Sequence, residues 1–113
     1  MLRENISYVK GDTYSRGFTI EGYELPITQI YFTVKERSSD KEYVLQKTLN
    51  NGIEADTSTR YVLTIEADDT NDLKTNYQYV FDIQIVMGTT KKTIIGGYFK
   101  LEDWDITAKA NEV

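Results

Sequence analysis

Carboxylates are the only acid–base groups that this chain carries in quantity, so they define the chemistry it could perform. The sequence has 18 Asp and Glu residues, but it has no histidine and no cysteine. The commonest general base, the commonest transition-metal ligand and any thiolate nucleophile are therefore missing. Two acidic clusters remain as candidates for a site: Glu102 with Asp103 and Asp105, and Asp68 with Asp69 and Asp72.

Neither cluster predicts a metal site. Asp103 and Asp105 would share one face of a strand, but calcium usually takes about six to eight oxygen ligands, and no loop here supplies so dense a set. The second cluster lacks the glycine and the distal glutamate of an EF-hand loop. Acids at the start of a helical turn cap its free N–H groups, so we interpret Asp69 or Thr70 as an N-cap. We predict no metal and no cofactor.

Asp82 is the most unusual carboxylate, because it lies between Phe81 and Ile83 in an apolar run. A buried, unpaired carboxylate costs several kcal/mol, so we expect a cross-strand ion pair with a lysine or arginine. Catalysis would need a second group, and the sequence offers none. It also lacks a G-x-S-x-G elbow and a glycine-rich phosphate loop. The chain is therefore not predicted to be an enzyme.

The nine tyrosines are the other group that could carry a function. Exposed tyrosines on a sheet can form a platform for sugars or proteins, although tyrosine is also an ordinary half-buried strand residue. Tyr31, Tyr43 and Tyr98 fall on the less apolar faces of their predicted strands, so they are the candidate interface residues. The tyrosines expected in the core are Tyr61, Tyr77 and Tyr79.

The elements that position these residues are predicted to be strands. Apolar residues occupy every odd position from 77 to 85, which is the period of a strand with one buried face. A turn at 87–90 would lead back through 93–101 as a long hairpin. Similar patterns predict further strands at 6–10, 13–20, 29–37, 42–49, 53–55 and 60–66. Only residues 67–73 suggest a helical turn.

These elements define the expected fold class. Seven or eight short strands at regular spacing favour a two-sheet sandwich or a small barrel. Our preferred prediction is an all-β, antiparallel, Ig-like sandwich with one short helical turn. The 113 residues form a single domain, 1–113, whose last residues, 108–113, are expected to fray.

Net charge and hydropathy exclude several kinds of partner. The net charge is −5, and no basic stripe is visible, which argues against nucleic acid and against anionic membranes. No apolar run approaches the ~20 residues that span a bilayer, and no signal peptide is recognisable. We expect a soluble protein made in the cytoplasm.

Five segments, taken in order, resemble a known family. They are Gly11-Asp12-Thr13 with 18–20, then 30–35, 61–66 with Asp69-Thr70 and Leu73, 79–85, and 97–101 with 105–107. This order is similar to the small β-sandwich structural proteins of tailed phages and prophages, such as the N-terminal domain of the baseplate upper protein. That protein has further segments, whereas this sequence stops at Val113, which favours a stand-alone accessory protein or an excised domain.

The resemblance implies a function without catalysis. It implies a virion component of the tail or baseplate, made in the cytoplasm of a bacterial host. Such a component would bind other virion proteins and would form a homo-oligomer. The resemblance concerns strands and turns, so it transfers no catalytic residue. The alternative interpretation is a carbohydrate-binding module that uses its surface tyrosines.

Overall fold

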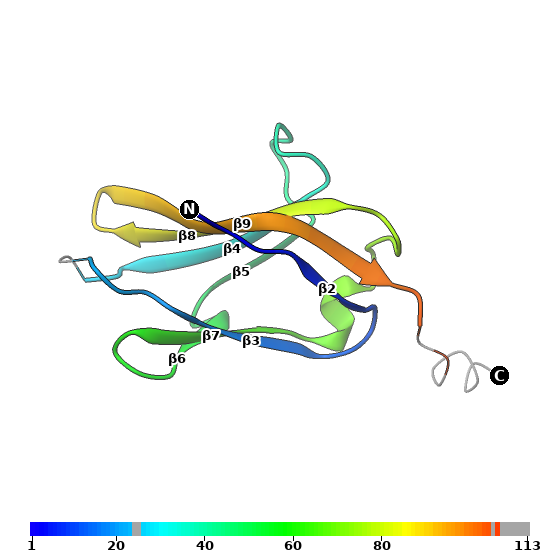
Figure 1. Ribbon diagram of the computed structural model, residues 1–113, viewed down its shortest axis with the longest axis horizontal. Coiled ribbons are helices and arrows are strands. Elements are labelled where there is room, and N and C mark those ends of the chain that lie inside the picture. Colours follow the sequence, from blue (N-terminus) through cyan, green and yellow to red (C-terminus); the bar gives the residue numbers. More distant parts are fainter. Residues whose placement is uncertain (24–25, 105, 107–113) are drawn as a thin grey trace.

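β-Strands dominate the regular secondary structure of the described residues (Figure 1). The computed structural model describes residues 1–23, 26–104 and 106. Its strands are β1 (Leu2–Arg3), β2 (Ile6–Val9), β3 (Tyr14–Thr19), β4 (Gln29–Lys35), β5 (Leu45–Leu49), β6 (Gly52–Ala55), β7 (Arg60–Ile65), β8 (Tyr79–Met87) and β9 (Thr90–Glu102). A 3-10 helix, η1 (Ala67–Thr70), follows β7. The predicted strands are confirmed with small shifts at their ends, whereas β1 was not predicted. The expected fraying at 108–113 lies outside the described residues.

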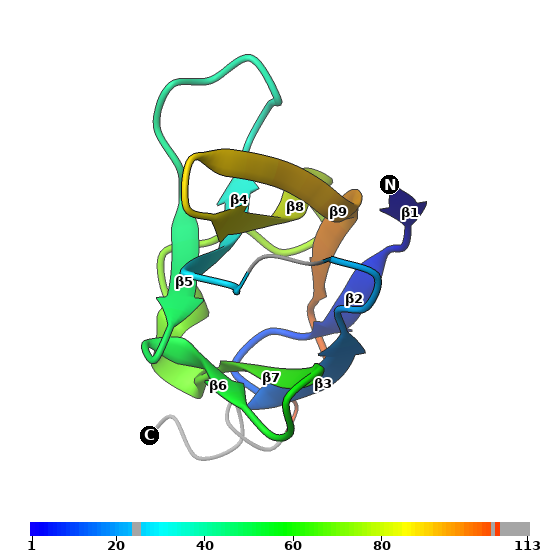
Figure 2. The same cartoon turned by 90° about the vertical axis from the view of Figure 1, so that its left-hand side faces the viewer.

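The strands form one continuous sheet that curls on itself, in the order β1-β9-β8-β4-β5-β6-β7-β3, with β2 also paired to β9. Figure 2 shows β4, β8 and β9 on one side of the interior and β3, β6 and β7 on the other. The prediction of two separate sheets is therefore wrong in detail, because β5 and β6 link the two halves. The sheet is also not purely antiparallel, since β1 and β2 pair with β9 in parallel, as do β5 and β6 with each other.

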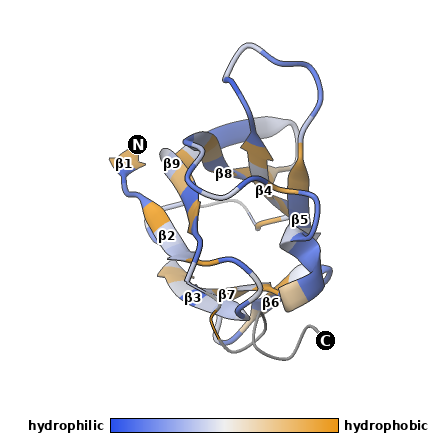
Figure 3. Cartoon of the chain, turned by 90° about the vertical axis from the view of Figure 1, so that its right-hand side faces the viewer, coloured by the Kyte–Doolittle hydropathy of each residue, from blue (hydrophilic) through white to orange (hydrophobic). Residues whose placement is uncertain are grey.

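Alternation along the strands builds the core. In β8 every odd residue from Tyr79 to Met87 is buried, and each residue between them is only half-buried. The same pattern holds for Ile30, Phe32 and Val34 in β4. Hydrophobic and hydrophilic residues accordingly alternate along the strands in Figure 3. This confirms the period-two prediction and leaves a polar outer face.

Residues 50–52 form a corner rather than a hairpin. Asn50 and Gly52 have φ angles of 68° and 100°, a region that asparagine and glycine tolerate. Asn51 N donates to Thr48 O and Asn50 N to Ile53 O, so the chain folds sharply before it continues as β6. The corner carries the sheet from one side of the interior to the other.

The helical turn has a different cap from the one predicted. Glu66 is the N-cap residue, and Asp69 lies three positions later. The Asp69 carboxylate accepts a hydrogen bond from Glu66 N at 2.7 Å, so Asp69 still stabilises the start of the turn. Leu73, just after the turn, is buried in the core. No helix in the described part of the chain has the length and apolar character needed to cross a bilayer.

The glycines of β9 allow the N-terminal segment to lie against that strand. A Cβ at Gly97 would lie 1.8 Å from the Glu4 carbonyl oxygen, so only glycine fits there without a shift. A pair of glycines inside a strand indicates either a bulge or the close packing of another backbone, and here the explanation is close packing. The bulge of β9 lies elsewhere, because the register shifts beside Ile83 and leaves Ile94 as the extra residue. Gly17 in β3 keeps a regular register, and the Arg60 side chain lies over it.

Candidate functional site: a trough on the outer face of the sheet

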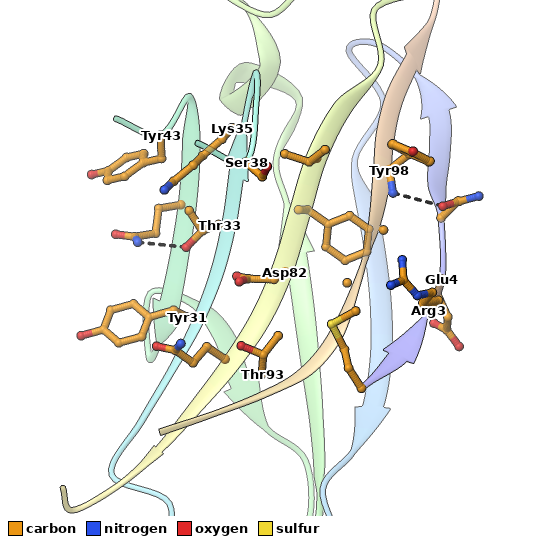
Figure 4. A pocket seen from close by; sticks show the side chains of 18 of the residues that line it. Arg3, Glu4, Tyr31, Thr33, Lys35, Ser38, Tyr43, Asp82, Thr93 and Tyr98 are labelled. Carbon is orange, nitrogen blue, oxygen red and sulfur yellow. Dashed lines mark hydrogen bonds between the residues drawn. The ribbon is translucent and has the colours of Figure 1, made fainter. Parts of the chain in front are cut away.

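The outer face of β4, β5, β8 and β9 carries a polar trough (Figure 4). Its central row is set by register, since Thr33 pairs with Gln46 on one side and with Asp82 on the other, and Asp82 pairs with Gly96. Gln46 Nε2 donates to Thr33 Oγ1 at 3.1 Å, which fixes one end of this row. We define the floor of the trough as Thr33, Gln46, Asp82, Gln84 and Thr93.

Two segments rise beside this floor and make it a trough. One wall is the β4–β5 loop, residues 36–44, which contributes Ser38, Lys41 and Tyr43. The other is the N-terminal segment, residues 1–5, held on β9 by hydrogen bonds from Glu4 N to Gly96 O and from Tyr98 N to Asn5 Oδ1. Figure 2 shows the loop and the N-terminus on either side of β4, β8 and β9.

The structure brings all three candidate tyrosines to this trough. Tyr31 extends from β4 and is half-buried, whereas Tyr43 and Tyr98 have 55% and 50% of their surface exposed. In Figure 4 Tyr31 and Tyr43 lie on one side of Asp82, and Tyr98 lies on the other. Tyr61 and Tyr79 are buried, as predicted, while Tyr77 is only partly buried.

Asp82 lies in the middle of the floor without the ion pair that was expected. None of the ion pairs among the described residues includes it. The nearest cationic strand residue, Lys35, instead donates from Nζ to the Asp40 carbonyl oxygen at 2.8 Å. Burial raises the pKa of the Asp82 carboxyl above its ordinary value, and the charge of Lys35 opposes that rise. Asp82 is only half-buried, which leaves its carboxylate accessible to solvent.

Replacing Asp82 by asparagine tests this environment. A carboxyl whose pKa is raised on folding binds protons more tightly in the folded state, so its contribution to stability falls as pH rises from the unfolded to the folded pKa. We expect Asp82→Asn to raise the thermal midpoint at pH 7 and to lose this advantage near pH ~3, below the ordinary pKa of aspartate. Thermal unfolding followed by circular dichroism at both pH values checks it. A lower midpoint at pH 7 would show that the ionised carboxylate is stabilising.

Two of the other acidic candidates, Asp69 and Glu102, make structural contacts. Asp69 Oδ2 lies 2.8 Å from Lys47 Nζ and also caps η1, whereas Asp68 and Asp72 are exposed. Glu102 accepts a hydrogen bond from Ser7 Oγ, and Asp105 lies outside the described residues. Among residues 1–23, 26–104 and 106, no group of three or more acidic side chains is placed to hold a metal ion.

Sequence reasoning did not find the cationic residues of the trough. Arg3, Lys41 and Lys91 all line it, and none of them forms an ion pair within the described part of the chain. Lys91 alone had a local signal, because it stands two positions before Thr93 on the same side of β9. Arg3 and Lys41 reach the trough through a parallel strand and a loop, which periodicity does not reveal.

Comparison with known proteins defines the class of fold. No protein-family model and no curated protein matches this sequence. Among solved structures, the chain is similar to the extracellular domain of the voltage-gated sodium channel β4 subunit, at 12% sequence identity and a TM-score of 0.50. The alignment covers 90% of this chain and 92% of that one. At this identity the likeness concerns the fold alone, and it supports an Ig-like β-sandwich class.

Proposed function

We propose that this chain is a non-enzymatic structural protein of a phage or prophage virion, a component of the tail or baseplate that works by binding other virion proteins. The observation that supports the binding role is the convergence of Tyr31, Tyr43 and Tyr98 on one trough. The assignment to a virion rests on the resemblance of the ordered strand motifs. The sodium channel domain is reported as a parallel homodimer, which is compatible with a homo-oligomer here.

The trough has the composition of a protein interface. Tyrosine is enriched at interface centres because it combines a large rigid ring with a polar end, and it loses few rotamers on binding. Exposed aromatic side chains grouped on one face commonly mark such sites. Asp82 has no second acid or base opposite it on the floor, so an acid–base mechanism has no support there.

The virion assignment is tested on particles. Mass spectrometry of purified or induced virions should detect this chain at a fixed ratio to the known tail or baseplate proteins. Cross-linking of intact particles should join trough residues such as Lys41 or Lys91 to a neighbouring virion protein. Absence of the chain from intact, infectious particles would contradict the proposal.

Substitution of the exposed tyrosines tests the trough itself. We expect Tyr43→Ala combined with Tyr98→Ala to weaken retention on virion proteins at least ~10-fold, because central aromatic residues commonly contribute more than ~1 kcal/mol each to an interface. Since both side chains are half exposed, the thermal midpoint should barely change. Tyr23→Ala is the matched control, because Tyr23 is exposed outside the trough. Equal loss in the control would contradict a role for the trough.

One feature favours carbohydrate binding as the second candidate. Tyrosines stand on both sides of a floor of hydroxyl, amide and carboxylate groups, which are the groups that hydrogen-bond to sugar hydroxyls while aromatic rings stack on the sugar faces (Figure 4). A glycan array should then give hits that Tyr31→Ala or Tyr98→Ala abolishes. An array without hits would leave the protein interface as the function of this face.

A further inference from the structure

The trough carries positive charge on an acidic protein. Four of its lining residues are cationic, namely Arg3, Lys35, Lys41 and Lys91, and two are acidic, namely Glu4 and Asp82. Glu4 is neutralised by Arg16 of β3. The whole chain has 13 Lys and Arg against 18 Asp and Glu, so its acidic excess lies outside the trough. The acids of the β4–β5 loop do not line the trough either.

One group of exposed acids lies on a different part of the surface from the trough, while Asp12, Glu21 and Glu42 are exposed elsewhere. Four exposed acidic residues without an ion pair in the described chain lie on β6, at η1 and just after it, and we call them the acidic side: Glu54, Glu66, Asp68 and Asp72. Two basic residues of the neighbouring strands do not neutralise these acids, because Lys47 forms an ion pair with Asp69 and Arg60 forms one with Asp56. Figure 2 shows β6 and β7 across the interior from β4, β8 and β9.

We infer that the trough binds the acidic side of a second copy of this chain, so that copies associate head to tail. This inference rests on the proposed assembly function and names one of its partners. Complementary charge favours the contact, because the free cations Arg3, Lys41 and Lys91 would face free carboxylates on the neighbour. Contact between two troughs is disfavoured, because it would place like charges together.

Head-to-tail association should produce larger oligomers, which a symmetric dimer would not. A pair of copies keeps one free trough and one free acidic side, so association continues into a ring or an open filament. Contacts between exposed charges weaken when the Debye length shortens, from about 30 Å at 0.01 M salt to about 3 Å at 1 M. Sedimentation at micromolar concentration should therefore show a concentration-dependent series of oligomers at low salt, and dissociation at high salt.

Two charge-reversed variants test the geometry. Lys41→Glu with Lys91→Glu removes the trough contact, and Glu54→Lys with Asp68→Lys removes the acidic contact; each variant alone should sediment as a monomer. Mixed at low salt, they should associate again, because the intact acidic side of one variant fits the intact trough of the other and the two charge-reversed faces are complementary to each other. Lys92→Glu with Lys100→Glu is the control for net charge, since neither residue lines the trough. The control should still form oligomers.

The outcomes separate this inference from the proposed function. A wild-type chain that is monomeric at low salt, or variants that stay monomeric when they are mixed, would overturn head-to-tail association. Such a failure to self-associate is expected if the trough binds only an acidic glycan or only another virion protein. Mass spectrometry of virions tests the proposed function independently. A monomeric chain that is present in particles would support the virion function and contradict head-to-tail association. An oligomeric chain that is absent from particles would do the opposite.

Discussion

Phe81→Ala is expected to lower the free energy of unfolding by about 3–5 kcal/mol. The Phe81 side chain is 4% exposed in the middle of β8, and its ring centroid lies 5.6 Å from that of Phe32 on the neighbouring strand. Phe32 in turn packs against Phe99 of β9, so removal of the Phe81 ring would open a cavity at the centre of three strands. Since small domains have total stabilities of about 5–15 kcal/mol, this loss would be a large fraction of the whole.

The neighbouring residues provide the comparison. Val80 lies on the outer face between Lys35 and Tyr98, so Val80→Ala should cost about 1 kcal/mol or less. Ile83→Ala, on the buried face, should cost about 2–5 kcal/mol. Urea unfolding of the three variants measures the difference. Equal losses for Val80→Ala and Phe81→Ala would show that β8 does not have one buried face.

Local patterns predicted the strands because burial on one face leaves a signal in consecutive residues. Ile30, Phe32 and Val34 alternate with polar residues, and the structure buries all three. The turn at Gly88 was equally readable, since its φ of 64° favours glycine. These features depend on neighbours in the sequence, which is why the sequence alone was sufficient.

Long-range pairing was not predictable in the same way. The corner at Asn50 and Gly52 looks like a hairpin turn in sequence, yet β5 and β6 run parallel after it. The two-residue strand β1 has no pattern of its own and exists because it can pair with β9. A short edge of this kind is determined by tertiary contacts rather than by propensity.

The candidate site shows the same division. The alternation of side chains along each strand correctly placed Tyr31 and Tyr98 on the outer face, because alternation depends only on neighbouring residues. Their convergence with Lys41 and Arg3 depends on the β4–β5 loop and on the N-terminal segment, whose positions no local pattern specifies. Asp82 lacks an ion pair for a similar reason. Lys35, which lies diagonally across from it on β4, donates instead to the carbonyl oxygen of Asp40 in the β4–β5 loop.

Gly97→Ala is expected to detach the N-terminal segment from β9 and to destabilise the domain by about 1–3 kcal/mol or more. The added Cβ would lie 1.8 Å from the Glu4 carbonyl oxygen and 2.7 Å from its carbon, which are backbone atoms that cannot rotate away. Relief of this clash requires β1 to move, with loss of the hydrogen bonds from Glu4 N to Gly96 O and from Tyr98 N to Asn5 Oδ1. One wall of the trough would move with it.

Gly96→Ala is the matched control, one residue earlier in the same strand. A Cβ there would lie 3.0 Å from Met1 Sδ, at the end of a flexible side chain, and 3.4 Å from the Phe81 carbonyl oxygen. Its cost should stay within about 1 kcal/mol, because the methionine can move aside. Hydrogen exchange should show faster exchange at residues 2–9 in Gly97→Ala only. Wild-type exchange and stability in Gly97→Ala would mean that the N-terminal segment does not lie against β9, and the trough would then lack its second wall.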